Sequence, residues 1–203
     1  MNLSERYKKE VVPAMIEKFG YKNQAVVPKL VKAVVNIGLS HGIKDPKFLE
    51  IAEATLRRIT GAHPARTLAK KSISNFKIRK GMVVGMVVTL RGKRMYDFVE
   101  KLVRITFPRI RDFRGLKSNS FDVGGNMTIG FKENIAFPEI RPDEIERLHG
   151  LEVTLVTTAK NKTEGLEFLK NMGFPFNEAL NEKRAKKKKK EKEKIKVINK
   201  TDK

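Results

Sequence analysis

The side chains best suited to chemistry are the cations of two short segments. Residues 70–81 read Lys-Lys-Ser-Ile-Ser-Asn-Phe-Lys-Ile-Arg-Lys-Gly. Their positive charges can bind phosphates, and their hydroxyls and one amide can bond sugar or phosphate oxygens. The segment also has an aromatic ring that can stack on a base. Residues 106–115 place three guanidinium groups for bidentate contacts, although Asp112 could pair with one of them internally. For Phe76 and Phe113, local packing competes at least evenly with stacking. Both segments predict binding.

Catalytic and metal sites are not indicated. The three histidines, His41, His63 and His149, are far apart and lack metal-ligand spacing, so we interpret them as loop or surface residues. Residues 81–85 lack the lysine of a phosphate-binding loop, and residues 124–126, Gly-Gly-Asn, are typical of a turn between strands.

The remaining catalytic classes also lack support. The chain has no cysteine, which excludes disulfides, a thiol nucleophile and zinc sites built on Cys. Asp143, Glu144 and Glu146 follow Pro142, where a helix start explains acidic residues. Ser72 and Ser74 belong to no nucleophile motif. We therefore predict a protein that is not an enzyme and needs no cofactor.

The positive charge is segregated along the chain. The formal net charge is +21 for 203 residues. The acid-free stretch 54–96 carries +11 with apolar residues between its cations, residues 177–203 carry +7 with no aromatic residue and little apolar surface, and the rest contributes +3. A polyanionic partner follows from this excess. The first stretch is expected on folded structure, and the second to be a mobile arm or a solvated helix.

Apolar periodicity predicts the elements that position these segments. The residues Tyr7, Val11, Met15 and Phe19 mark one helix, which Pro13 should kink or restart. The expected helices cover residues 7–20, 45–61, 98–108 and 163–173, with Asp45 and Thr163 as N-caps, Phe98, Leu102 and Ile105 facing the core, and Pro108 closing the third helix. The expected strands cover residues 31–37, 66–72, 82–90, 127–131 and 151–158.

This order of elements favours an α+β fold. Strands and helices mix without strict alternation, so a mainly antiparallel sheet is expected. The length and the 40% of hydrophobic residues predict one compact domain, residues 1–176, with a Lys-rich extension, residues 177–203. No stretch has the ~20 consecutive apolar residues of a membrane span, and no apolar signal core is present, so we expect a soluble protein of a reducing compartment with no membrane partner.

Among polyanions, RNA is favoured over DNA. No predicted helix concentrates basic side chains for entry into a major groove, whereas cations on loops and a sheet suit folded RNA. The composition alone also suits a DNA-coating protein or a binder of heparin-like polyanions. A free RNA-binding regulator or RNA chaperone and a basic enzyme acting on RNA are further alternatives.

Four stretches, in order and in register, resemble the bacterial large-subunit ribosomal protein family numbered five, which binds 5S ribosomal RNA. They are residues 72–81, 88–92, 108–115 and 137–140, and the likeness runs from about Tyr7 to Phe176. The resemblance implies a five-stranded antiparallel sheet with helices on one side. It also implies a cytoplasmic ribosomal protein at the central protuberance of the large subunit.

The resemblance implies three contact regions. In the family, the sheet and adjoining loops hold 5S rRNA, and the matching residues here are Asn36 and Thr89, with Arg91, Arg66 and Lys70 beside them. A basic loop approaches peptidyl-site tRNA, and its residues here are Ser72, Ser74, Asn75, Lys77, Arg79 and Lys80. Residues 109–137, with Arg109, Arg111 and Arg114, are similar to a region that forms an intersubunit bridge to a protein of the small-subunit head. Large-subunit rRNA and neighbouring large-subunit proteins are further implied partners.

The chain departs from the family pattern in several places. Ala62 and His63 follow Gly61, where the family usually has a glutamine that contacts 5S rRNA. Gly124 replaces a common arginine, and Val83 a common proline. Residues 177–203 extend past the usual end of the family, and their deletion is expected to lower non-specific RNA affinity without changing discrimination.

Overall fold

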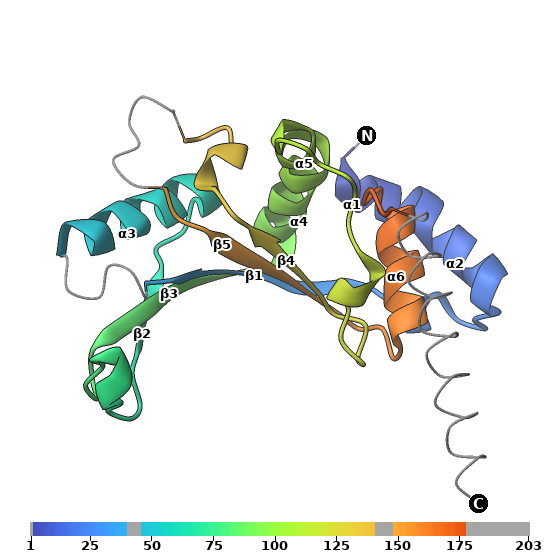
Figure 1. Ribbon diagram of the computed structural model, residues 1–203. Coiled ribbons are helices and arrows are strands. Elements are labelled where there is room, and N and C mark those ends of the chain that lie inside the picture. The colour runs from blue at the N-terminus through green and yellow to red at the C-terminus, as the bar shows by residue number, and fades with distance from the viewer. Residues whose placement is uncertain (1, 40–45, 141–147, 178–203) are drawn as a thin grey trace, which may run out of the picture.

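The chain folds as one curved sheet with helices on one side (Figure 1). The computed structural model describes residues 2–39, 46–140 and 148–177. The helices are α1 (Leu3–Arg6), α2 (Val12–Phe19), α3 (Pro46–Thr60), α4 (Gly92–Lys101), α5 (Phe107–Arg109) and α6 (Lys162–Asn171), and the strands are β1 (Leu30–Gly38), β2 (Ala65–Leu68), β3 (Val83–Leu90), β4 (Met127–Phe131) and β5 (Leu151–Thr157). The expected α+β class with a five-stranded antiparallel sheet is confirmed.

The sheet has the strand order β2-β3-β1-β5-β4, and every neighbouring pair is antiparallel. The long strand β1 lies in the centre, where it pairs with β3 from Ala33 to Gly38 and with β5 from Leu30 to Asn36. Both sides of β1 are therefore fixed by ladder hydrogen bonds, which sets which of its side chains share a face.

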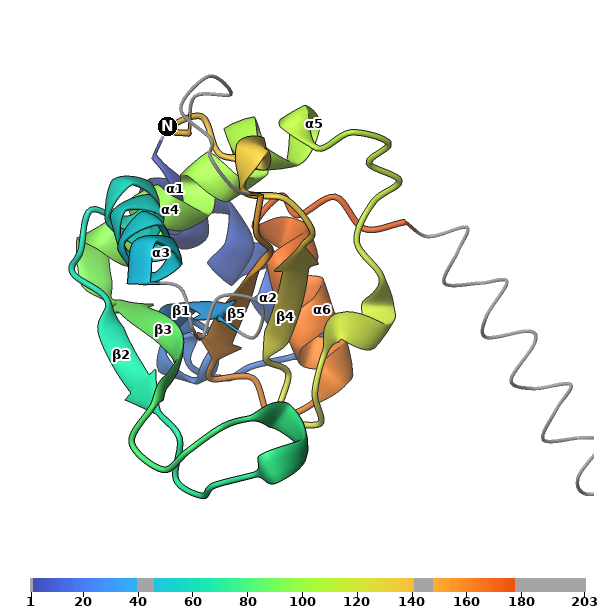
Figure 2. The same ribbon diagram turned by 60° about the vertical axis from the view of Figure 1, so that its left-hand side comes forward.

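The hydrophobic core lies between the sheet and the helices. Alternate residues of β1 turn toward the helices, and Ala33, Val35 and Ile37 are fully buried there. The helices close this side with Leu56 and Ile59 of α3 and with Met95, Phe98 and Val99 of α4. Figure 2 shows the same arrangement from another side, with α3, α4 and α6 on the covered face of the sheet.

Two π turns lie immediately before prolines and change the helix faces. They span Tyr7–Val11, ahead of Pro13, and Leu102–Thr106, ahead of Pro108. In each, the residue before the proline donates its N–H to the carbonyl five residues back, which relieves the clash of a proline ring with the usual acceptor turn. The helix at Pro13 restarts as α2, as the sequence suggests.

The second π turn contradicts one expectation. Ile105 was expected in the core, yet it is 44% exposed, while Thr106 and Phe107 are buried in its place. The wider π turn contains one additional residue, so the buried face of the helix shifts by one position along the chain. Pro108 also does not close the helix, since α5 continues through Arg109.

Smaller differences concern caps and helix or strand ends. The N-cap of α6 is Asn161 and not Thr163, because the helix starts at Lys162. The strand expected at residues 66–72 covers only Ala65–Leu68, after which the chain leaves the sheet. Phe19, expected on an apolar face, is 38% exposed and stacks on Tyr21. Asp45 as a cap, the helix start at residues 143–146, His41 and the tail from residue 178 all lie outside the described residues.

Within the described residues, no helix is both long enough and apolar enough to cross a bilayer.

Candidate nucleic-acid interface

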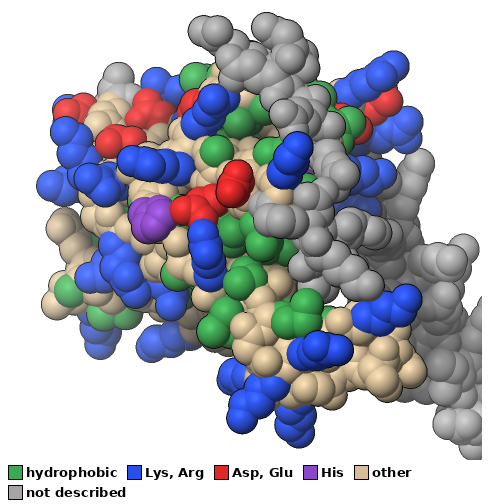
Figure 3. All heavy atoms as spheres, turned by 90° about the vertical axis from the view of Figure 1, so that its left-hand side faces the viewer, with side chains coloured by type: hydrophobic (Ala, Val, Ile, Leu, Met, Phe, Trp, Pro, Cys, Tyr) green, Lys and Arg blue, Asp and Glu red, His purple; other side chains and the backbone are tan. Residues whose placement is uncertain are grey.

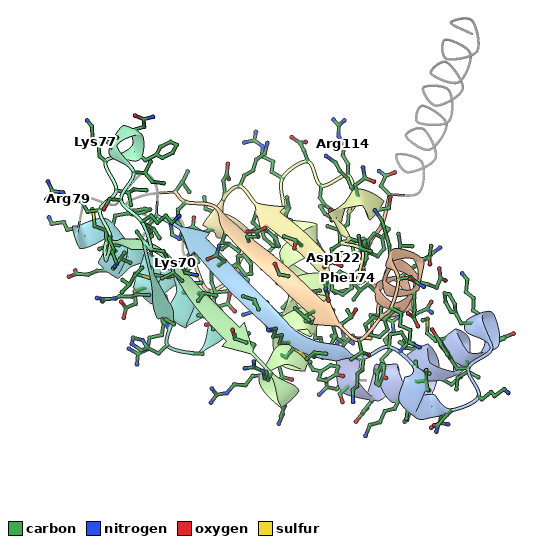
Figure 4. All side chains as sticks on the ribbon, turned by 90° about the horizontal axis from the view of Figure 1, so that it is seen from below. Lys70, Lys77, Arg79, Arg114, Asp122 and Phe174 are labelled. Carbon is green, nitrogen blue, oxygen red and sulfur yellow. The ribbon has the colours of Figure 1, made fainter. Side chains whose placement is uncertain are left out.

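The sheet face opposite the helices is open (Figure 4), and it carries two of the residues expected to contact rRNA, Asn36 and Thr89. Asn36 of β1 is paired with Val87 of β3, and Val34 of β1 with Thr89 of β3. Since neighbouring strands keep their side chains in register, Asn36 and Thr89 lie on this same face. We call it the open face. Its side chains are Lys32, Val34, Asn36, Ala65, Thr67, Val87, Thr89, Thr128, Glu152, Thr154 and Val156, with glycines at positions 85 and 130.

The polar groups of the open face are largely unused inside the chain. The side chains of Asn36 and Thr89 make no hydrogen bond to any described residue. The hydroxyls of Thr128 and Thr154 lie 3.1 Å apart and bond to each other across β4 and β5. An amide with a donor and an acceptor, and hydroxyls that rotate, are groups that can bond bases, sugars or phosphates.

The open face is close to neutral. Among its side chains only Lys32 and Glu152 are charged. The cations instead lie at its two ends, with the segment after β2 at one end and Arg91, directly after β3, at the other. This separation suits an RNA whose phosphates contact the cations at the ends of the open face while its bases and sugars contact the strands.

The segment between β2 and β3, residues 69–81, forms a small separate hairpin, which we call the basic loop. Ile73 and Ile78 bridge in antiparallel fashion, with N–H···O distances of 2.9 and 3.1 Å, and Lys77 adopts φ +54° at the turn. The Lys80 N–H donates to Ser72 Oγ at 2.9 Å, so this hydroxyl helps to shape the loop. The loop is thus locally ordered, although it packs little against the core.

The cations of the basic loop point into solvent. Lys70, Lys71, Lys77, Arg79 and Lys80 are all exposed. In Figure 4 the labelled Lys70, Lys77 and Arg79 lie at one end of the sheet, and in Figure 3 Lys and Arg side chains gather at the lower end of the molecule.

Two apolar side chains of the loop, those of Ile73 and Phe76, are exposed as well. Phe76 is 71% exposed, so the interpretation of its ring as a local core plug is wrong. Its free ring faces are available for stacking.

Arg66 does not join the open face. It is paired with Met86, a core residue, and its guanidinium donates to Glu53 of α3 at 2.9 Å. The hydrogen bond from Arg66, with the nearby charges of Arg66, His63 and Arg57, lowers the pKa of Glu53. The sequence placed Arg66 with the rRNA residues, but its charge is shared with an internal carboxylate on the side of the helices.

Arg109, Arg111 and Arg114 are all exposed. Between them, the ring of Phe113 stacks on buried Phe107 at 5.4 Å between centroids, which favours the packing interpretation for Phe113. Asp112 makes no ion pair with a described residue and adopts φ +54°. In Figure 4, Arg114 lies well away from Lys77 and Arg79, so the two groups belong to different surfaces.

The turn at residues 122–126 is confirmed as a connection between extended segments. Phe121 and Met127 bridge in antiparallel fashion, and Asp122 accepts two hydrogen bonds from Asn126 at 2.8 Å each. These hydrogen bonds lower the pKa of Asp122. A Cβ on Gly165 of α6 would overlap the Gly125 carbonyl oxygen, so the lack of a side chain at Gly165 allows α6 to sit directly on the turn.

The described histidines do not form a site. His63 is exposed beside Glu53, with Nδ1 3.6 Å from Oε1. His149, expected in a loop or at the surface, lies in a loop but is only 7% exposed, with Phe48 edge-on to its ring. Within residues 2–39, 46–140 and 148–177, no three His, Asp or Glu side chains gather as metal ligands would.

Several members of the open face were not singled out by sequence reasoning. Thr128, Thr154 and Glu152 belong to strands that were predicted, but their face depends on the pairing register. The alternation of residues 151–157 was the available signal, since every second residue there is buried.

Comparison with known proteins gives consistent matches over most of the chain. A family model described as Ribosomal protein L5 matches residues 23–79, and a second model, for the C-terminus of the same ribosomal family, matches residues 83–176. The large ribosomal subunit protein uL5 of Carboxydothermus hydrogenoformans is 51% identical over 86% of this chain and 98% of its own length. The uL5 proteins of Heliobacterium modesticaldum and Thermotoga maritima are 53% and 51% identical, each over 86% of this chain and 97% and 95% of their own lengths.

Proposed function

The chain belongs to the ribosomal protein L5 family and is a non-enzymatic component of the large subunit of the cytoplasmic ribosome, and from this premise we propose that its open face binds 5S rRNA. The observation that carries the proposal is the pair Asn36 and Thr89. Both lie on a sheet face without a covering layer, and neither side chain has a hydrogen-bonding partner in the described part of the chain. Polar groups left free on a rigid strand are available to fix the register of an RNA.

The flanking cations supply the affinity of this interface. Arg91 and Lys70 are exposed near opposite ends of β3, within reach of a backbone that crosses the sheet. Each phosphate neutralised adds roughly 0.7 to 0.9 to the slope of log affinity against log salt concentration. Arg66 contributes less, because its guanidinium already bonds Glu53.

Two further contacts belong to the same proposal. The basic loop reaches peptidyl-site tRNA, because its cations are exposed and Lys77 and Arg79 lie at one end of the sheet (Figure 4). The group of Arg109, Arg111 and Arg114 contributes to a bridge toward a protein of the small-subunit head, since it forms a separate exposed surface. A mostly neutral sheet and two cationic projections would thus serve three partners at the central protuberance.

The test compares binding of the purified full chain to 5S rRNA and to an unrelated folded RNA of similar length, at several salt concentrations. We expect tighter binding to 5S rRNA at every salt concentration, with similar salt slopes for the two RNAs. Equal affinity for both would refute specific binding. Stoichiometric co-sedimentation with large subunits in salt-washed lysate distinguishes a ribosomal component from a free RNA-binding regulator or chaperone.

A further inference from the structure

Glu152 is the one acidic side chain on the open face. It lies directly opposite Asn36 on β1 and Gly130 on β4. A carboxylate repels phosphates, so its position on an RNA-binding face needs a reason other than affinity. The side chain is exposed, and it makes no ion pair or hydrogen bond with any described residue.

No described cation forms an ion pair with this carboxylate, and Lys32, the cation within the open-face strands, is distant from it. Lys32 is four residues before Asn36 on β1, which places it about 13 Å along the strand from the row of Glu152. Lys32 is instead paired with Val156, near the other end of β5. The negative charge of Glu152 is therefore available to a ligand.

Asn36 and Glu152 together form a defined hydrogen-bonding pattern. Residues directly opposite each other on antiparallel strands have Cβ atoms about 5 Å apart. A carboxylate accepts through two oxygens, and the neighbouring amide can donate. Gly130, the next residue in the row, has no side chain and leaves the far side of Glu152 open.

We propose that Glu152 and Asn36 read the Watson–Crick edge of one unpaired guanine in the RNA that crosses the open face. Guanine presents two adjacent donors, N1–H and the 2-amino group, beside the acceptor O6. The carboxylate of Glu152 accepts from both donors, and the amide of Asn36 donates to O6. Cytosine has a single amino donor on that edge and would leave one carboxylate oxygen without a partner.

The surroundings of the pair favour a base over the backbone at this point. The strand residues beside it, Val34 and Val87, are half-buried and uncharged, whereas the cations lie at the ends of the sheet. Unpaired bases in RNA loops are commonly read on their hydrogen-bonding edges. The carboxylate thus excludes phosphates from its part of the face and selects base donors, which makes Glu152 a specificity residue.

The inference rests on the proposed binding of 5S rRNA, and its test uses the full chain. The substitution Glu152→Gln keeps the size of the side chain and removes one negative charge. Charge alone would make the variant bind every RNA more tightly. Base reading instead lowers the affinity for 5S rRNA by about 10- to 100-fold, the range for loss of one bidentate base contact, without lowering that for the unrelated RNA.

A matched control makes the same change elsewhere. Glu17 is exposed on α2, away from the open face, and Glu17→Gln is expected to leave 5S rRNA affinity unchanged or slightly raised. Unchanged thermal unfolding of both variants is expected, because neither side chain is buried. If the parent chain fails to prefer 5S rRNA, the proposed function fails; if it prefers 5S rRNA but Glu152→Gln binds as tightly or more tightly, only this inference is overturned.

The base is identified by replacing the guanines of 5S rRNA one at a time with inosine, which lacks the 2-amino group. At one position, we expect inosine to weaken binding of the parent chain about tenfold. The same inosine should not weaken binding of the Glu152→Gln variant further, because the effects of two groups in contact are not additive. The absence of any such position overturns the assignment to guanine.

Discussion

The open face and the basic loop differ in almost every property, although both are attributed to RNA contact. The open face lies on the five paired strands of the sheet, and of its side chains only Lys32 and Glu152 are charged. The basic loop has five exposed cations within residues 70–80 and hangs from β2 and β3 as a small hairpin. One region presents fixed neutral groups, and the other presents charge.

The two regions therefore suit two different tasks: the open face can fix the position of an RNA, and the basic loop can attract its phosphates. Phosphate contacts are the same along any RNA, so they raise affinity without reading sequence. Hydrogen-bonding groups distinguish one site from another only if they are held in place. The protein therefore puts cations on a projecting loop and keeps its amide and hydroxyls on the strands.

Of the substitutions that test this comparison, those on the open face are expected to change RNA affinity most. The double substitution of Asn36 and Thr89 by Ala should lower 5S rRNA affinity by about a hundredfold or more, since each lost hydrogen bond leaves an RNA group unsatisfied at about 1–3 kcal/mol. The slope of log affinity against log salt should stay the same. Filter binding across salt concentrations measures both quantities.

The control for this pair removes the same atoms elsewhere. Asn119 and Thr163 are exposed outside the open face, and their double substitution by Ala should leave 5S rRNA binding unchanged. A loss equal to that of Asn36 and Thr89 would mean that the open face has no special role.

A smaller and qualitatively different effect is expected from the basic loop. Replacing Lys77, Arg79 and Lys80 by Ala should leave 5S rRNA binding nearly intact and weaken the contact with tRNA on assembled ribosomes. The salt slope of tRNA binding by the isolated chain should fall by roughly 2 to 3, one phosphate for each cation. Crosslinking to peptidyl-site tRNA on ribosomes that carry the variant measures the contact.

The matched control has the same charge change on the N-terminal helical region. Lys8, Lys9 and Lys22 are exposed there, and their triple substitution by Ala should preserve the tRNA crosslink. If the crosslink survives the triple change in the loop, the tRNA assignment is wrong.

The smallest effect concerns Arg66, which belongs to neither region. Glu53→Gln removes its ion pair at a cost of less than about 1 kcal/mol in the free energy of unfolding, because Arg66 is 58% exposed. The same change frees a cation and should slightly raise the affinity for any RNA.

The pH dependence of that ion pair has a definite sign. The pKa of Glu53 is lowered in the folded chain, so its stabilisation is fully present above the unfolded value of about 4.3 and is lost as the pH falls through the folded value. Denaturant unfolding of the parent and Glu53→Gln chains should differ at pH 7 and converge in acid. A difference that grows in acid would contradict this.

Sequence patterns predicted where helices and strands lie better than which of their side chains are buried. The strands at residues 82–90, 127–131 and 151–158 and the helix ending near Gly61 match the structure closely, because their apolar spacing is regular. Ile105 fails for a local reason, since one π turn before Pro108 shifts the face in a way that a fixed 3.6-residue period cannot include.

The residues of the open face and the basic loop could be found from the sequence only in part. The basic loop was found from charge alone, because cations close together in sequence stay close in space. Thr128, Thr154 and Glu152 were not, since a place beside Asn36 depends on the pairing of β1, β5 and β4. Arg66 was grouped with the rRNA residues for its charge, whereas its partner Glu53 is 13 positions away and becomes visible only after folding.

The sheet without a second layer has a thermodynamic consequence. Val34, Val87 and Val156 remain half-buried on the open face of the isolated chain, so the fold resembles one half of a sandwich. If RNA binds this face as proposed, it would act as the missing layer and would stabilise the native state that it binds. At a free RNA concentration of 100 times Kd, this linkage adds about 2.7 kcal/mol to the free energy of unfolding. The melting temperature should then rise with RNA concentration, and chains made in excess of their RNA would be the first substrates for proteolysis.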